Sequence, residues 1–232
     1  MTELDGLRRA AIVGVALAIV VSFPANAALF AAFGWDIEAA IFGDSAAILG
    51  RDPSAASLLR WGAIGDMFYS YLLLVPLALF LHRRLRRNSP WVADLGLVAA
   101  LAYIFVGGAG AAILAIAGSS LVDAYAVAAP PDQPGIATSF ELVRNVVYFA
   151  LWQMLDPITA GTWILTTGVL LFRERPVVAR FLIVLGAAFG AMSLMTMFGA
   201  RSLGLLALGV VGVFVIWGTW VVIGRAHASG RT

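Results

Sequence analysis

Residues 146–165, VVYFALWQMLDPITAGTWIL, are apolar enough to cross a membrane, yet they carry the pair Asp156–Pro157 near their middle. A hydrocarbon core of ~30 Å is crossed by ~20 apolar helical residues. A charged side chain at the centre of such a helix costs at least ~2.5–3.5 kcal/mol. The stretch therefore predicts a transmembrane helix whose aspartate faces other helices or water rather than lipid.

The composition extends this prediction to the whole chain. Of its 232 residues, 62% are hydrophobic and 12% are charged, whereas soluble domains are roughly 45–50% apolar and ~25% charged. We expect an all-α, polytopic bundle that forms one domain, residues 1–232, in a lipid bilayer. Its six predicted spans are residues 10–33, 59–81, 92–118, 143–172, 178–199 and 203–224.

The arginines predict the orientation. They cluster before the first span, in the connections 82–90 and 173–180, and after the last span, whereas the opposite connections hold most of the acids. By the positive-inside rule both termini are cytoplasmic. All basic residues are arginine and alanine and glycine are frequent, which indicates the cytoplasmic (inner) membrane of a bacterium with a GC-rich genome.

The two longer outer connections carry their own signals. Residues 37–50, IEAAIFGDSAAILG, have enough apolar periodicity for a short helix on the outer surface. In the connection 119–140, the prolines and glycine of APPDQPG predict a turn that ends the third span.

The fourth span carries a stripe of polar and aromatic residues. At helical spacing one face holds Glu141, Asn145, Tyr148, Trp152, Asp156, Thr159 and Trp163. Pro157 has no N–H, so the carbonyl of Gln153 loses its usual helical donor and is able to accept a bond from a ligand, a water or a side chain. The alternative is a plain helix kink, with Asp156 hydrogen-bonded to a neighbouring span.

A second carboxyl, Asp66, lies in the second span on the face of Tyr69. It should differ in depth from Asp156 by about one helical turn, ~5 Å. We expect the two carboxyls to share one site. The alternative for Asp66 is a salt bridge to Arg60 or Arg144.

Other residues of the outer halves are candidates to line this site. They are Trp61, Phe68, Tyr69, Tyr148, Trp152, Asn26, Asn145, Glu141 and Arg144. Trp61 suits either an interfacial anchor or a lid, and Glu141 with Arg144 also suits a structural ion pair. Asn26 alone also suits an interhelical hydrogen bond.

Several site chemistries are disfavoured. The chain has no cysteine, and its two histidines, His82 and His227, lie far apart, whereas metal sites need clustered ligands. We expect no metal and no cofactor. The basic residues lie where topology needs them, so nucleic-acid binding has no support.

Two carboxyls among aromatic rings suit acid chemistry on an apolar substrate. Burial and a second carboxyl nearby both favour the neutral acid, and aromatic faces stabilise cations. Asp156 or Asp66 would then serve as a general acid that starts the carbocation cyclisation of a prenyl chain.

At these residues the chain resembles the small integral-membrane terpene cyclases, helical bundles that use membrane-embedded acids. The resemblance lies in size, hydropathy, aromatic content and paired acids, and covers the bundle as a whole. It implies a lyase or isomerase acting on an isoprenoid. Fungal members have seven spans and a late second acid, whereas residues 203–224 contain no carboxyl, so Asp66 and Asp156 are assigned from this chain alone. PLALFLHRRLRR, residues 76–87, is similar to uncharacterised six-span actinobacterial proteins, which implies no activity.

Two other classes stay open. Thr159, Thr162 and Thr166 continue a line of hydroxyls from Asp156 toward the cytoplasm, which suits a proton-linked transporter or channel, although membrane threonines usually bond their own helix. A non-catalytic lipid-binding protein would need only the inward polar bonds. The enzyme is the interpretation that we favour.

Overall fold

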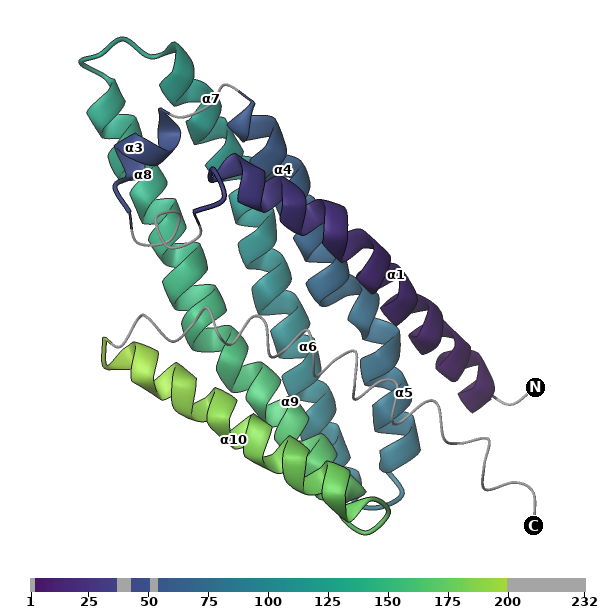
Figure 1. The fold of residues 1–232 in the computed structure, drawn as a ribbon. Helices are drawn as coiled ribbons and strands as arrows, with labels where there is room; N and C mark the ends of the chain where they lie inside the picture. Colours follow the sequence, from purple (N-terminus) through teal and green to yellow (C-terminus); the bar gives the residue numbers. More distant parts are fainter. Residues whose placement is uncertain (1–2, 37–42, 51–53, 200–232) are drawn as a thin grey trace.

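The computed structural model describes residues 3–36, 43–50 and 54–199, and within these ranges all regular structure is helical (Figure 1). Three segments, η1, η3 and η4, are π-helical and η2 is a 3₁₀ turn. The elements are α1 (Glu3–Ala32), α3 (Ser45–Leu49), α4 (Ala55–Asp66), η1 (Met67–Tyr71), η2 (Leu72–Leu74), α5 (Val75–Leu85), α6 (Pro90–Ile113), η3 (Leu114–Gly118), α7 (Ser119–Val127), α8 (Gln133–Asn145), η4 (Val146–Leu155), α9 (Asp156–Leu171) and α10 (Pro176–Met197).

Five continuous helices are long and apolar enough to cross a membrane, and they correspond to the first five predicted spans. They are Glu3–Ala32, Ala55–Leu85, Pro90–Val127, Gln133–Leu171 and Pro176–Met197. The sixth predicted span, 203–224, lies outside the described residues.

The third and fourth helices extend well beyond the predicted spans. They have 38 and 39 residues, which at 1.5 Å per residue gives roughly 57 and 58 Å, against a hydrocarbon core of ~30 Å. The connection predicted at 119–140 is therefore mostly helical, and the turn is confined to residues 128–132. Pro134 does not interrupt α8, because it occupies the first turn, where no helical N–H bond is lost.

The short helix predicted on the outer surface is packed into the protein instead. Only Ser45–Leu49 of that stretch is helical among its described residues, and the side chain of Asp44 caps it by accepting from the amide of Ala46 (3.1 Å). Ile48 and Leu49 are buried in contact with the α7–α8 end of the bundle. The apolar residues of α3 thus face helices rather than a lipid surface.

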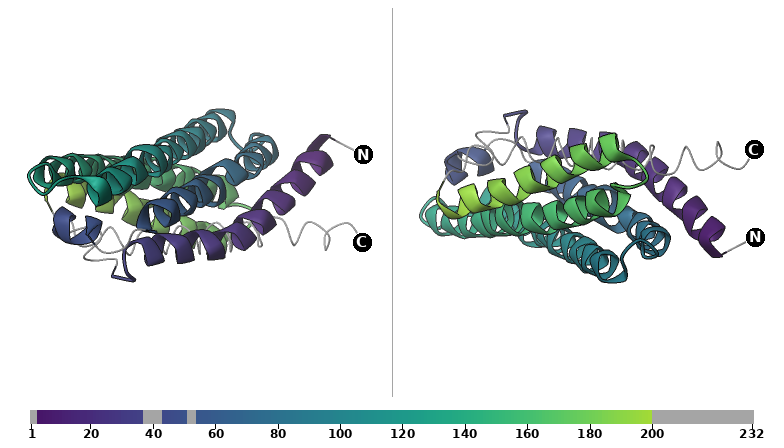
Figure 2. Two further views of the ribbon diagram at one scale, coloured as in Figure 1. Left: turned by 90° about the horizontal axis from the view of Figure 1, so that it is seen from above. Right: turned by 90° about the horizontal axis from the view of Figure 1, so that it is seen from below.

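The helices pack in the order in which the chain folds back on itself. α1 lies along α4 and α5, α6 lies between α5 and α9, and α10 packs on α9 (Figures 1 and 2). The α9–α10 approach depends on small residues, because a Cβ on Gly161 would lie 2.7 Å from the carbonyl oxygen of Gly186.

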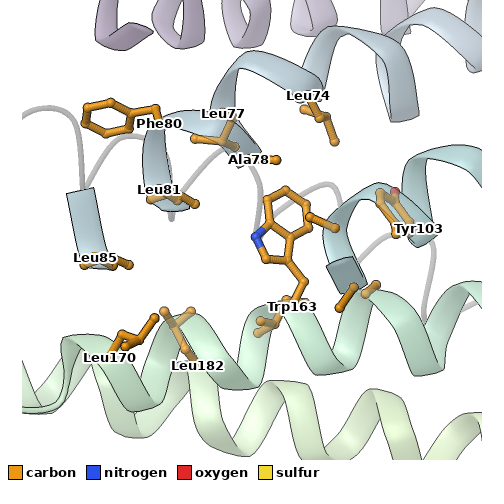
Figure 3. Packing of buried hydrophobic residues seen from close by; sticks show 14 of the residues in the cluster. Leu74, Leu77, Ala78, Phe80, Leu81, Leu85, Tyr103, Trp163, Leu170 and Leu182 are labelled. Atoms are coloured by element: carbon orange, nitrogen blue, oxygen red, sulfur yellow. The ribbon is translucent and has the colours of Figure 1, made fainter. Parts of the chain in front are cut away.

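The core has two hydrophobic clusters, one at each end of the bundle. At the arginine-rich end Trp163 of α9 points between α5 and α6 toward Leu77, Ala78 and Tyr103 (Figure 3). The other cluster joins α3, α4, α7 and α8 and reaches down to Trp152. Asp156 follows Trp152 in the chain and precedes Ala160 of the first cluster, so it lies where the two clusters meet.

The arginine-rich connections lie together at one end of the bundle. Arg83 contacts Glu3 (2.6 Å) and Arg84 contacts Glu174 (3.7 Å), which brings the start of α1, the end of α5 and the α9–α10 turn side by side. The α7–α8 turn lies at the opposite end (Figure 1).

Single cysteines test the predicted orientation cleanly, because the chain has none of its own. Arg87 and Ala129 are both exposed, at opposite ends of the bundle. We expect a membrane-impermeant maleimide to label Ala129→Cys in intact cells and Arg87→Cys only after permeabilisation. The reverse labelling pattern would mean that the orientation is opposite to the predicted one.

Candidate functional site

The site is built around a hydrogen bond between the second and fourth of the membrane-length helices. The hydroxyl of Tyr71 donates to Oδ2 of Asp156 over 2.8 Å. Asp156 is 5% exposed, and its other oxygen, Oδ1, is buried with no hydrogen-bond partner. A carboxyl inside the bundle is thus held by one oxygen and presents the other.

Asp66 has hydrogen bonds of its own on the second of these helices. Its Oδ1 accepts from the hydroxyl of Ser70 (2.8 Å), and the carbonyl of Ser70 accepts from the hydroxyl of Tyr103 (3.2 Å). The ring of Tyr103 in turn packs on Tyr71, the residue bonded to Asp156, with ring centroids 5.1 Å apart. That the two carboxyls act as one site stays a prediction.

Neither carboxyl forms an ion pair with a described residue. The salt bridges considered for Asp66 are wrong, because both arginines have other partners. Arg60 bonds Ser119 (3.2 Å) and contacts Asp123 (3.7 Å), and Arg144 donates to the carbonyl of Gly43 (2.7 Å).

Glycines of α6 seat the aromatic rings of the site. A Cβ on Gly107 would lie 1.8 Å from Cε1 of Tyr71, and one on Gly110 would lie 2.7 Å from Nε1 of Trp152. The same indole N–H donates to the carbonyl oxygen of Gly107 (3.2 Å). The run VGGAGAA, residues 106–112, is therefore a packing surface for rings from two other helices, which is typical of small residues in helix packing.

The π-helical turns explain why sequence reasoning missed Tyr71. At α-helical spacing, Asp66 shares a face with residues three and four positions later, and Tyr71 is five positions later. The η1 segment, Met67–Tyr71, widens the turn so that a five-residue step returns to the same side. Tyr103 was also missed, although a lone tyrosine in the apolar α6 was a signal that its hydroxyl needs a buried partner.

A π-helical segment also answers the question raised by Asp156–Pro157. η4 ends at Leu155 and α9 begins at Asp156. Pro157 therefore stands in the first turn of a renewed α-helix, where a missing N–H is tolerated.

Several predicted site residues do lie near the carboxyls. Tyr148 and Trp152 are buried, with their rings edge to face at 5.0 Å. Tyr69 lies beside Asp66 and donates to Oδ1 of Asn26 on α1 (3.1 Å). Asn26 thus serves as an interhelical partner.

Other predicted residues are not brought to the site. Trp61 and Phe68 are 65% and 45% exposed, so they face away from the bundle and do not enclose the carboxyls. Glu141 is exposed, Asn145 is half-buried at the end of α8, and Arg144 is buried against the loop before α3. Trp61 fits an interfacial anchor better than a lid.

The threonines below Asp156 bond their own helix. The hydroxyls of Thr159, Thr162 and Thr166 donate to the carbonyls of Leu155, Ile158 and Thr162, respectively. These bonds are local helix bonds of the kind expected for membrane threonines, and they do not form a chain of hydroxyls.

Within the described ranges no three histidine or acidic residues cluster as metal ligands would. No family model matches the chain, and no curated protein and no solved structure matches it. The site is therefore interpreted from its own geometry.

The close packing of the Tyr71 ring on Gly107 predicts that alanine substitutions at two neighbouring glycines differ in their effect on stability. Gly107→Ala should destabilise the purified protein by about 1–3 kcal/mol, because the new methyl group displaces the tyrosine ring. Gly108→Ala is the matched control, since its Cβ would meet nothing closer than 3.9 Å. Thermal unfolding in detergent measures the stability of both variants. Equal stability would refute the close packing of the Tyr71 ring on Gly107.

Proposed function

We propose that this chain is an integral-membrane terpene cyclase in which Asp156 protonates a prenyl substrate. The observation that carries the proposal is the buried Asp156 carboxyl, which accepts from Tyr71 through one oxygen and leaves the other without a partner. In the neutral acid, that second oxygen would carry the proton and present it to a substrate.

The first step of the proposed reaction moves one proton and forms one C–H bond. The O–H bond of Asp156 breaks, and its proton adds to a terminal alkene carbon of the substrate. The alkene π electrons form the new C–H bond, which leaves a carbocation that the next alkene attacks to close a ring. A final deprotonation returns the proton to a carboxylate of the site.

Tyr71 supports this step through the conjugate base. Its hydroxyl donates to the oxygen of Asp156 that does not carry the proton. A hydrogen bond to a carboxylate is stronger than one to a neutral acid, so the bond strengthens as the proton leaves. Tyr71 is a positioning residue in this scheme.

Aromatic rings on both sides of the acid would stabilise the cation. Toward the arginine-rich end, Tyr103 packs on Tyr71 with ring centroids 5.1 Å apart and on Trp163 at 6.3 Å. Toward the other end lie Tyr148 and Trp152. These rings replace the exposed Trp61 and Phe68 as the proposed aromatic wall.

Asp66 fits a second role, as the carboxyl that returns the proton to Asp156. Ser70 holds it by a hydrogen bond, and Tyr103, which donates to the carbonyl of Ser70, packs on the ring of Tyr71. A pair of carboxyls in one site divides acid and base roles between its members.

The substitution Asp156→Asn tests whether Asp156 is the general acid. Asparagine keeps the shape and the acceptor oxygen but is no comparable acid, so we expect a folded protein that forms no cyclised product from prenylated substrates. Product analysis by mass spectrometry measures this, and Asp132→Asn, on the exposed α7–α8 turn, is the control that keeps wild-type conversion.

Two results would contradict acid catalysis by Asp156. Full conversion by the asparagine variant would remove it as the donor. A wild-type protein that converts no prenyl substrate, but dissipates a pH gradient in liposomes, would favour proton transport in its place.

A further inference from the structure

Arg144, near the end of α8, is a buried arginine that pairs with no acid among the described residues. The residue is 4% exposed. Its Nη1 donates to the carbonyl oxygen of Gly43 (2.7 Å), and its Nε is buried with no hydrogen-bond partner. Arginines are almost never fully buried unless they are paired. A positive charge and an N–H donor thus lie inside the protein without the anion that usually accompanies them.

Two acids lie close to Arg144 in the chain or in the loop that it contacts, but neither forms an ion pair with it. Glu141, three positions earlier on α8, is exposed. The carboxylate of Asp44 caps α3 by accepting from the amide of Ala46 (3.1 Å). The guanidinium is therefore left to pair with an anion from outside the described chain.

A second donor without a partner lies at the same contact. The carbonyl that accepts from Arg144 belongs to Gly43, and α3 begins two residues later at Ser45. The hydroxyl oxygen of Ser45 is buried with no hydrogen-bond partner, and α3 packs on α8, the helix of Arg144. Guanidinium and hydroxyl groups both donate to phosphate oxygens. The contact between α3 and α8 therefore suits a phosphate group.

Arg144 also begins a row of buried side chains that leads to Asp156. The row continues on the same membrane-length helix through Tyr148 and Trp152, which are buried with their rings edge to face at 5.0 Å. Both rings belong to the hydrophobic cluster that includes the apolar residues of α3. An apolar chain attached to a phosphate at Arg144 would thus find an aromatic surface beside it.

Contacts through α6 join the other end of this row to the acid. The indole N–H of Trp152 donates to the carbonyl oxygen of Gly107 (3.2 Å), and the ring of Tyr71 packs on the same glycine. Tyr71 in turn donates to Asp156 (2.8 Å). Arg144 and Asp156 are twelve positions apart, which at 1.5 Å per residue is about 18 Å along the helix. A prenyl chain of several isoprene units would reach from one to the other.

We propose that the contact between α3 and α8 binds the phosphate or diphosphate of a prenyl substrate through Arg144, so that the far alkene of the chain reaches Asp156. The choice of a prenyl chain rests on the proposed cyclase function, in which protonation begins at the terminal alkene. Binding leaves the bond between the prenyl carbon and the phosphate oxygen intact. The phosphate serves to hold the chain in one direction along Tyr148 and Trp152.

Thermal unfolding of the purified full chain in detergent measures this binding. Four probes are compared: farnesyl diphosphate, farnesol, inorganic pyrophosphate and phosphatidylglycerol. They separate a prenyl phosphate from a prenyl chain alone, a free anion and an anionic lipid headgroup. Because a ligand that binds only the folded state stabilises it, we expect the unfolding midpoint to rise and saturate with farnesyl diphosphate. The shift should be severalfold larger than with any other probe.

The substitution Arg144→Lys assigns the shift to the guanidinium. Lysine keeps the positive charge but lacks the planar fork of N–H donors that bonds a phosphate in two places, so we expect the shift to fall severalfold. Arg60→Gln is the matched control. It removes an arginine of α4 that bonds Ser119 and contacts Asp123, and it should keep the full shift.

Two outcomes would overturn the site. The first is a wild type that another of the four probes stabilises as much as farnesyl diphosphate does. The second is an undiminished shift in Arg144→Lys, and if that variant does not fold, the wild-type comparison alone decides. The measurement needs no turnover. A chain that binds farnesyl diphosphate through Arg144 but forms no cyclised product would refute the cyclase and leave this site standing.

Discussion

The hydrogen bond from Tyr71 to Asp156 ties the second membrane helix to the fourth at the level where the two hydrophobic clusters meet. In lipid, a carboxyl inside a bundle needs such a partner, because hydrocarbon offers none. Gly107 leaves room for the tyrosine ring, and Tyr71 is the last residue of the π-helical segment η1. The backbone geometry of η1, the packing of Tyr71 on Gly107 and the hydrogen bond to Asp156 therefore depend on one another.

The proposed acid chemistry rests on the asymmetry of this carboxyl. One oxygen is held by Tyr71, and the other has no partner. A proton on the free oxygen would make the group an acid among aromatic rings.

The helical class, the first five spans and the inward direction of Asp156 follow from hydropathy and the cost of a charge in lipid. The length of the third and fourth helices could not be predicted from hydropathy. The polar residues around 119–140 lower the hydropathy, but most of them are still helical. The exposure of Trp61 and the contact of Tyr71 with Asp156 were also not predicted from the sequence. A stripe drawn at 3.6 residues per turn fails wherever a π-helical turn changes the period.

The most direct test of this constraint is a double-mutant cycle between the two bonded residues. Tyr71→Phe and Asp156→Leu each remove the hydrogen bond, and the difference between their separate and combined effects on unfolding free energy isolates it. Hydrogen bonds between membrane helices couple by about 0.6 kcal/mol on average and up to about 1.7 kcal/mol. We expect a stabilising coupling of at least about 0.6 kcal/mol, and a coupling indistinguishable from zero would contradict the central role given to this bond.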